Sequence, residues 1–238
     1  MIINVKDFKS PTSLSEALQL RAENESSKFL AGGVILSRTI GASVEMLIDL
    51  THLPLDYIKT TGDEIKIAAM VKINDLYRNT ELIQLKTGKI LSEVAGYVAS
   101  EQIRNMATVG GAIFAKHYWS DIIPMFMVLN AKLTFENLNG EFTEGIEDFL
   151  NPKNHKKFQG SILKEISIQK LKGDYKFYFE SISRTKVDIA TLNLAVLYLI
   201  TGDKKVEDIR ISSGGLEPVI RRYSKVENYL TGKKLTKN

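Results

Sequence analysis

The sequence contains no cysteine among its 238 residues, and this absence limits its chemistry directly. A chain without thiols forms no disulfide and holds no cysteine-bound iron–sulfur cluster. Any such cluster that works with this protein must therefore be bound by another polypeptide. The absence also fits the reducing environment of the cytoplasm, which is the location we expect.

Long apolar runs and targeting signals are lacking as well. No stretch approaches the roughly 18 apolar residues that a membrane-spanning helix needs. The first ten residues, MIINVKDFKS, do not show the basic-then-apolar layout of a signal peptide. We therefore expect neither secretion nor a membrane partner.

The excess of positive charge is small and local. The formal net charge is +4, but residues 221–238 carry six Lys or Arg against one Glu, a local +5 that leaves the first 220 residues at −1. A nucleic-acid-binding protein would spread its basic residues over one face of the fold, with aromatic residues among them. We expect no nucleic-acid partner.

Several common motifs of cofactor binding and catalysis do not occur. Among the sixteen glycines, no two are separated by a single residue, so the GxGxxG fingerprint of Rossmann folds is excluded. A GxxxxGK phosphate loop and a GxSxG nucleophile elbow are missing too. His52, His117 and His155 are too far apart in sequence for a local metal motif. The sequence favours neither metal-centred nor serine-hydrolase chemistry.

Two diglycine segments lie in the first half of the chain. FLAGGVILSR at 29–38 places Gly32 and Gly33 directly after an apolar run, and IRNMATVGGAIFAKHYWSD at 103–121 contains the second pair. Adjacent glycines let backbone N–H groups approach phosphate oxygens closely. A single diglycine is more often only a tight turn. Two such loops together are suited to holding one pyrophosphate.

Both segments belong to an ordered set of motifs that resembles the FAD-binding subunit of molybdenum hydroxylases. This family includes the flavin domains of xanthine dehydrogenase and the medium subunit of carbon monoxide dehydrogenase. The specific part is the IRNxAT(V/I)GG element, followed by a serine–aspartate pair and a proline. The matching segments are AGG at 31–33, MLIDL at 46–50, IKIAAMVKINDL at 65–76, IRNMATVGGAI at 103–113, SDIIPMFMVLNAKL at 120–133 and SRTKVDIATLNLAV at 183–196.

The resemblance implies an α+β fold: a two-part, PCMH-type FAD-binding domain followed by a small α+β C-terminal domain. We expect the FAD-binding domain at residues 1–160, with possible subdomains at 1–53 and 54–160, and the C-terminal domain at 161–238. The polar, lysine-rich segment 151–160 is the best candidate linker. The C-terminal domain is short for the family.

The resemblance also implies which residues hold FAD, without a covalent bond. The first loop would wrap the pyrophosphate, the second diglycine would complete it from the other side, Asp121 would bind the adenosine portion, and Leu163 would lie near the isoalloxazine. The implied cofactor-binding residues are Phe29, Leu30, Ala31, Gly32, Gly33, Val34, Ile35, Leu36, Thr108, Val109, Gly110, Gly111, Ala112, Asp121 and Leu163. No catalytic residue and no metal ligand is implied in this chain.

Four positions depart from the family pattern. Val34 and Ile35 follow the first diglycine, where the family has Thr or another polar residue. Ala112 and Ala115 replace an asparagine and a hydroxyl or polar residue after the second diglycine. Each change removes a side-chain donor, at about 0.5–1.5 kcal/mol per hydrogen bond. We expect weaker FAD binding through the backbone donors that remain.

The resemblance further implies an oxidoreductase subunit that relays electrons. FAD would receive them from 2Fe-2S clusters on a partner iron–sulfur subunit and pass them to NAD or another acceptor. Substrate would be hydroxylated on a large molybdopterin subunit. Two alternatives stay open: a self-contained FAD-dependent reductase or oxidase, and a flavin-free scaffold subunit.

Other residues near these motifs have two interpretations each. His117, Tyr118 and Trp119 either stack on or gate the flavin, or pack in the core or against a subunit. Arg184 and Lys186 either place a cation near the reduced flavin or lie in a solvated loop.

Local patterns predict most secondary structure. A capping box at Ser13–Glu16 predicts a helix between strands around 4–8 and 28–31. Further strands are expected at 46–50, 65–68, 161–168, 174–182 and 208–212, with a hairpin turning at 137–140. Further helices are expected at 75–84 capped by Asn74, 89–99, 122–129 beneath the flavin, 188–201 capped by Asp188 and packed in the core, and 226–230.

Overall fold

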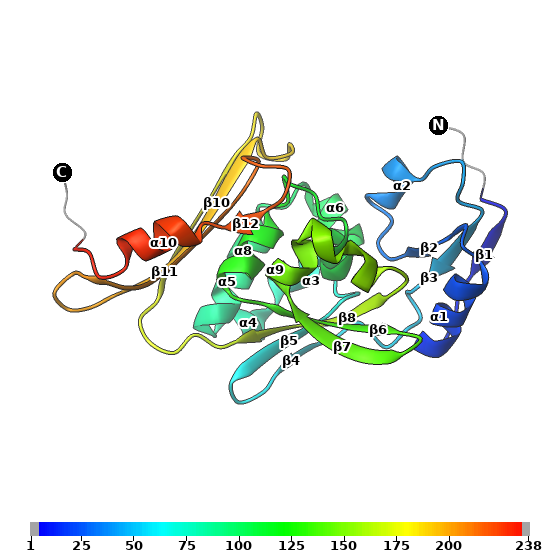
Figure 1. Cartoon of the computed structure of the whole chain (residues 1–238), viewed down its shortest axis with the longest axis horizontal. Helices are drawn as coiled ribbons and strands as arrows, with labels where there is room; N and C mark the ends of the chain where they lie inside the picture. Colours follow the sequence, from blue (N-terminus) through cyan, green and yellow to red (C-terminus); the bar gives the residue numbers. More distant parts are fainter. Residues whose placement is uncertain (1–4, 235–238) are drawn as a thin grey trace.

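The computed structural model describes residues 5–234, and these residues form three sheets (Figure 1). The first sheet is parallel, with the strand order β1-β3-β2. Its elements are β1 (Asp7–Lys9), α1 (Leu14–Glu23), β2 (Ser27–Leu30), α2 (Leu36–Thr39) and β3 (Met46–Asp49). The strand expected around residues 4–8 is β1, and residue 4 lies outside the described part.

The capping box that begins α1 is confirmed. Ser13 Oγ accepts a hydrogen bond from the Glu16 N–H at 3.2 Å, and the Glu16 carboxylate accepts from the Thr12 N–H at 3.0 Å. The first bond satisfies an amide that the first turn of a helix leaves without a partner, and the second holds the residue that precedes the N-cap. The helix covers Ile48 of β3 through Ala17 and Leu18, which are buried in a small core.

The second sheet has five antiparallel strands in the order β4-β5-β8-β6-β7. The strands are β4 (Ile58–Thr60), β5 (Glu64–Ala68), β6 (Lys132–Asn137), β7 (Gly140–Gly145) and β8 (Ile162–Gln169). Between β5 and β6 the chain forms α3 (Ile73–Arg78), α4 (Thr80–Ile83), α5 (Lys86–Ala95), α6 (Glu101–Met106), α7 (Val109–Phe114) and α8 (Ile122–Val128). The hairpin predicted at 137–140 is confirmed as the β6–β7 turn.

The position of β8 corrects the expected start of the C-terminal domain at residue 161. This strand lies in the middle of the second sheet, so the change to the third sheet comes after Gln169. The polar segment 151–160 is also more ordered than a linker, because most of it forms the 3-10 helix η1 (Pro152–Phe158), which follows α9 (Ile146–Leu150). Phe158 is only 3% exposed and packs against Phe135 and Phe149. Composition alone did not reveal this buried aromatic anchor.

The third sheet is antiparallel, in the order β12-β11-β10-β9. Its elements are β9 (Lys176–Ile182), β10 (Leu192–Ile200), β11 (Val206–Gly214), β12 (Arg221–Arg222) and α10 (Ser224–Leu230). The helix predicted at 188–201 is wrong, since β10 occupies most of this range. Burial along β10 alternates with a period of two, with Asn193, Ala195 and Leu197 buried. Apolar residues on both faces of the strand imitated a helical pattern.

The predicted helix at 75–84 is divided at Asn79. Asn74 lies buried inside α3 rather than capping it, whereas Asn79 caps α4 by accepting from the Leu82 N–H at 2.8 Å. Helix α3 instead begins at Ile73, one residue before the predicted cap. Helix α5 begins before the expected residue 89 and ends at Ala95.

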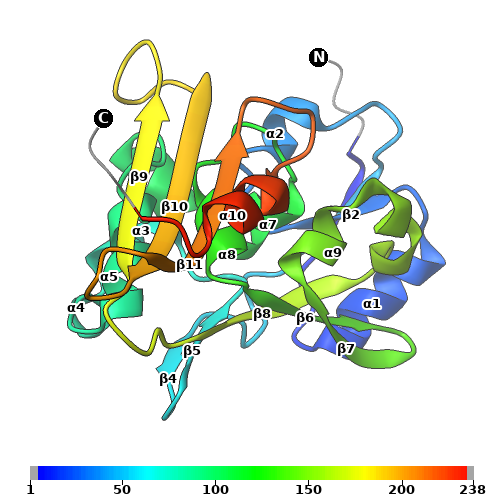
Figure 2. The same ribbon diagram turned by 60° about the vertical axis from the view of Figure 1, so that its left-hand side comes forward.

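Helix α8 is the central element of the main core. Every side chain from Ile122 to Val128 is buried, and the third sheet lies along this helix (Figure 2). Ala195 and Leu197 of β10 belong to the same core as the second sheet. No helix within residues 5–234 is long and apolar enough to cross a membrane.

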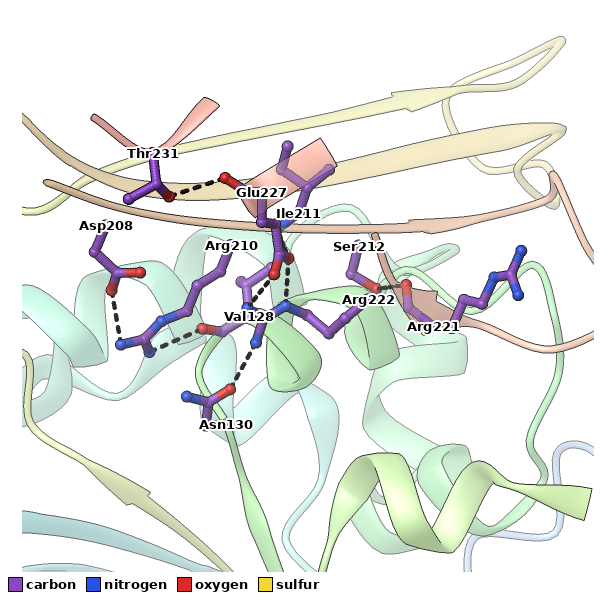
Figure 3. Close-up of polar contacts among 10 residues, drawn as sticks. All are labelled: Val128, Asn130, Asp208, Arg210, Ile211, Ser212, Arg221, Arg222, Glu227 and Thr231. Atoms are coloured by element: carbon purple, nitrogen blue, oxygen red, sulfur yellow. Dashed lines mark hydrogen bonds and ion pairs between the residues drawn. The ribbon is translucent and has the colours of Figure 1, made fainter. Parts of the chain in front are cut away.

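A polar cluster attaches the third sheet to the C-terminal end of α8 (Figure 3). Arg210 donates to the Val128 carbonyl at 3.3 Å, and Arg222 donates to Asn130 Oδ1 at 2.7 Å. The Arg222 guanidinium also pairs with both carboxylate oxygens of Glu227, at 2.6 and 2.8 Å. The cluster thus joins α8, β12 and α10.

Candidate functional site

The first diglycine lies in the loop that follows β2. A Cβ placed on Gly32 would lie 2.0 Å from the Met106 carbonyl oxygen, so only glycine permits this close approach. Gly33 has a φ of +72°, in the left-handed region that favours glycine. The two glycines are therefore required for different reasons, and together they turn the chain from β2 into α2.

The backbone N–H groups of this loop are available to a ligand. From Ala31 to Ile35, five consecutive amides have no hydrogen-bond acceptor among residues 5–234. The carbonyls of Gly33 and Ile35 are occupied, because they accept from Ser37 and Thr39 at 2.9 and 3.1 Å. Unpaired backbone donors around a left-handed glycine are a feature of many anion-binding loops.

The second diglycine is not a bend, and its amides are not available. It forms the first turn of α7, with Thr108 as the N-cap. The N–H groups of Val109 and Gly110 donate to the carbonyls of Val71 and Ala69, both at 2.9 Å. The Gly111 N–H donates to Thr108 Oγ1 at 3.1 Å, and the Ala112 N–H to the Thr108 carbonyl at 3.0 Å. The expectation that this segment supplies backbone donors is corrected: its amides hold α7 on the end of β5.

The two diglycine segments nevertheless lie side by side. Gly32 contacts the Met106–Ala107 peptide, and a Cβ on Gly111 would lie 3.8 Å from the Ala31 Cβ. Gly110 packs so closely on Ala69 that a Cβ there would lie 2.5 Å from the Ala69 Cβ. The second segment is therefore a wall that supports the first loop.

Asp121 lies at the start of α8 and is held by the third sheet. Its Oδ1 accepts from Ser181 Oγ at 2.9 Å and from Asn193 Nδ2 at 3.2 Å. Its Oδ2 accepts no hydrogen bond within the described part of the chain. Burial raises the pKa of Asp121, and the bonds from Ser181 and Asn193 oppose this rise only in part. One carboxylate oxygen is thus fixed by the fold and the other is free for a ligand.

The other implied residues are buried or half-buried. Leu163 is 5% exposed and belongs to the main core, where β8 pairs it with Phe135. Phe29 packs against the small core of the first sheet. Val34, Ile35 and Leu36 are half-buried at the start of α2.

The aromatic segment after α7 forms its own stack. The His117 and Trp119 rings are parallel with centroids 4.2 Å apart, and Tyr118 meets Trp119 edge-on at 4.7 Å. Burial lowers the pKa of His117. Arg184 lies on an exposed loop and pairs with Asp188 at 3.5 Å. Two cavities, of about 300 and 460 Å³, lie elsewhere and include no residue of the first loop.

The comparisons with known proteins agree with this geometry. Residues 4–169 match the family described as the FAD binding domain in molybdopterin dehydrogenase, and residues 177–238 match the CO dehydrogenase flavoprotein C-terminal domain. The chain belongs to this family of FAD-binding molybdenum hydroxylase subunits. The expected family and α+β architecture are thereby confirmed.

Two relatives show how far the similarity extends. The glyceraldehyde dehydrogenase medium chain of Sulfolobus acidocaldarius is 28% identical over 228 residues, which cover 94% of this chain and 80% of the relative. A solved structure of carbon monoxide dehydrogenase from Hydrogenophaga pseudoflava, which lacks the Mo-pyranopterin moiety, matches with a TM-score of 0.90 at 28% identity. The match covers 100% of this chain and 84% of that one.

The residues of this family member fit the cofactor of its family. A pyrophosphate needs donors and no side-chain obstruction, and the loop from Ala31 to Ile35 offers free amides next to two glycines. Val34 and Ile35 replace polar residues of the family pattern, but this change does not affect the backbone donors.

Replacing Asp121 with asparagine tests the cost of this buried charge. Because the fold raises the pKa of Asp121, the folded chain binds this proton more tightly than the unfolded chain. Protonated Asp121 therefore contributes to stability at low pH, and this contribution is lost as the pH rises through the pKa of Asp121 in the folded chain. Asp121→Asn keeps an oxygen acceptor without charge, so we expect its melting temperature to exceed that of the wild type at about pH 7. The difference should vanish near about pH 3, below the usual carboxyl pKa. A variant that melts lower than wild type at neutral pH would contradict this assignment.

Proposed function

We propose that this protein is the flavoprotein subunit of a molybdopterin-dependent dehydrogenase complex. Its FAD would lie non-covalently against the loop from Ala31 to Ile35 and would carry electrons from 2Fe-2S clusters on an iron–sulfur subunit to NAD or another acceptor. A large molybdopterin subunit would oxidise the substrate. The observation that carries the proposal is the run of five unpaired amides beside the Gly32–Met106 contact.

Within this chain, binding and orientation are the main tasks. The free amides of the first loop would hold the pyrophosphate oxygens, while Gly110 and Gly111 let α7 support that loop from behind. The free Oδ2 of Asp121 would accept from a hydroxyl of the adenosine ribose. Leu163 would contribute to the apolar floor below the isoalloxazine. When bound, FAD supplies a carrier that takes up single electrons and releases two.

The partner subunits are inferred from chemistry and from the relatives. A chain without cysteine cannot hold a cysteine-bound iron–sulfur cluster, so electrons would reach this subunit from another chain. Its relatives include proteins named as medium chains of glyceraldehyde dehydrogenase and carbon monoxide dehydrogenase. A medium chain implies larger and smaller partners in the same complex.

The single tryptophan, Trp119, makes FAD binding directly measurable. We expect a saturable quench of its fluorescence when the apoprotein is titrated with FAD, because flavin accepts excitation energy from a nearby indole. ADP-ribose, which has the pyrophosphate and adenosine but no flavin, should compete. Riboflavin lacks both groups and should bind at least about tenfold more weakly, since two or more hydrogen bonds to a charged group are lost.

The outcomes separate the candidate functions. If no flavin binds, the protein is a flavin-free scaffold subunit, as Ala112, Ala115 and the occupied amides of α7 would favour. If riboflavin binds as tightly as FAD, the first loop does not hold the pyrophosphate. If the bound flavin is reduced by a small-molecule substrate without any partner subunit, the protein is a self-contained reductase or oxidase.

A further inference from the structure

The segment from Tyr118 to Asp121, between α7 and α8, is held residue by residue by the third sheet. Asn193 Nδ2 lies 3.4 Å from the Trp119 carbonyl, 3.1 Å from the Ser120 carbonyl and 3.2 Å from Asp121 Oδ1. The Gly215 N–H donates to the Tyr118 carbonyl at 2.7 Å. Four consecutive residues are therefore bound to the neighbouring ends of β10 and β11.

Asn193 uses its whole side-chain amide in this contact. Its Oδ1 accepts from the Gly214 N–H at 2.8 Å, and the residue is only 1% exposed. The rest of β10 is apolar apart from the Tyr198 hydroxyl. A buried amide costs free energy unless it is hydrogen-bonded, so an apolar residue would serve packing better here. The polar side chain is explained by the segment that it binds.

A third diglycine makes room for this contact. A Cβ on Gly214 would lie 2.7 Å from both Asn193 Oδ1 and the Tyr118 carbonyl oxygen. Gly215 has a φ of +90°, and a Cβ there would lie 2.2 Å from the Thr191 carbonyl oxygen. Neither position accommodates a side chain. Asn193, Gly214 and Gly215 thus form one unit, which we call the Asn193 clasp.

We propose that Asn193 is a positioning residue for the FAD site, which it affects without contacting the cofactor. Resting on the function proposed above, the Asn193 clasp fixes the Tyr118–Asp121 segment and so directs the free Oδ2 of Asp121 toward the adenosine. It also holds Trp119 in its stack on His117. By this route the third sheet contributes to FAD affinity.

The test compares Asn193→Leu with Ser212→Ala. Leucine has a similar volume but no amide, whereas Ser212 lies on the adjacent strand β11, is fully buried and donates to the Arg221 carbonyl at 3.0 Å, away from the segment. Both variants remove buried hydrogen bonds from the same sheet. FAD dissociation constants, Trp119 emission and near-ultraviolet circular dichroism are measured for each, with melting temperatures to gauge stability.

We expect Asn193→Leu to weaken FAD binding by about tenfold or more, because the Asp121 carboxylate is then no longer held in position to accept a hydrogen bond from the cofactor. Its Trp119 emission should shift to longer wavelength and its tryptophan dichroism should diminish, even without FAD. Ser212→Ala should keep the wild-type dissociation constant and spectra. The proposal is overturned if folded Asn193→Leu binds FAD as the wild type does, or if Ser212→Ala weakens binding equally.

Two further results complete the test. Should Asn193→Leu not fold, Asn193→Ser keeps one donor, and an unchanged dissociation constant in that variant overturns the proposal. If the wild-type protein itself binds no FAD, the proposed function fails instead. In that case the Trp119 spectra of the variants still show whether Asn193 orders the segment.

Discussion

Gly32→Ala is expected to abolish FAD binding and to lower the free energy of unfolding by roughly 3 kcal/mol or more, as forced overpacking does. The new methyl group would lie 2.0 Å from the Met106 carbonyl oxygen, 2.8 Å from its carbon and 3.1 Å from the Ala107 Cα. All three are backbone atoms, so no side-chain rotation relieves the clash. The first loop has to move away from α6, and its free amides move with it.

Denaturant unfolding and the Trp119 titration with FAD measure these two effects. Gly62→Ala is the matched control, because a Cβ at Gly62 has no neighbour within 4 Å, and it should leave both quantities unchanged. Gly33→Ala should have an intermediate effect of about 1–2 kcal/mol, the usual cost of a left-handed backbone for a residue with a Cβ. Wild-type stability and affinity in Gly32→Ala would mean that the loop and α6 do not meet in solution.

Glu227→Leu is expected to lower the free energy of unfolding by about 3–5 kcal/mol, the usual cost of leaving one member of a buried ion pair alone. The side chains of Glu227 and Arg222 are only 10% and 16% exposed. Glu227 also accepts from the Ile211 N–H at 2.7 Å, which would lose its partner (Figure 3). The cluster that joins α10 and β12 to the end of α8 would be broken.

The double variant Arg222→Met/Glu227→Leu separates charge from packing. It should lose less stability than Glu227→Leu alone, because it leaves no uncompensated charge. Arg78→Met is the exposed control: Arg78 and Glu101 are also 2.6 Å apart, but their side chains are 61% and 48% exposed. This variant should lose less than about 1 kcal/mol. A loss in Glu227→Leu as small as in Arg78→Met would show that the buried pair does not secure the third sheet.

Features that depend on neighbouring residues were predicted well from the sequence. The capping box of α1, the β6–β7 hairpin and the turn of the first diglycine after β2 all appear where expected. Each is determined by residues within a few positions of one another, so the pattern contains the physical cause. The family motif is of the same kind, because it is a contiguous run of residues.

Features that depend on residues far apart in the sequence were not predicted well. The β10 strand was predicted as a helix because its apolar residues line both faces, and only its pairing with β9 and β11 decides its conformation. Asn193 was consequently placed on a helix and its role went unrecognised. The start of the C-terminal domain was misplaced for a similar reason, since β8 pairs with β5 and β6, which lie far from it in sequence.

The diglycines at 32–33 and 110–111 show most clearly the difference between what nearby residues determine and what distant residues determine. The sequence by itself determined where the side-chain-free positions lie and that the first pair ends a strand. It could not determine which amides remain free, because a hydrogen-bond acceptor can come from any part of the chain. The tertiary structure brings Ala69 and Val71 to the amides of α7 and leaves those from Ala31 to Ile35 without an acceptor in the described residues. Similar glycine pairs thus become a packing surface in one place and a candidate phosphate site in the other.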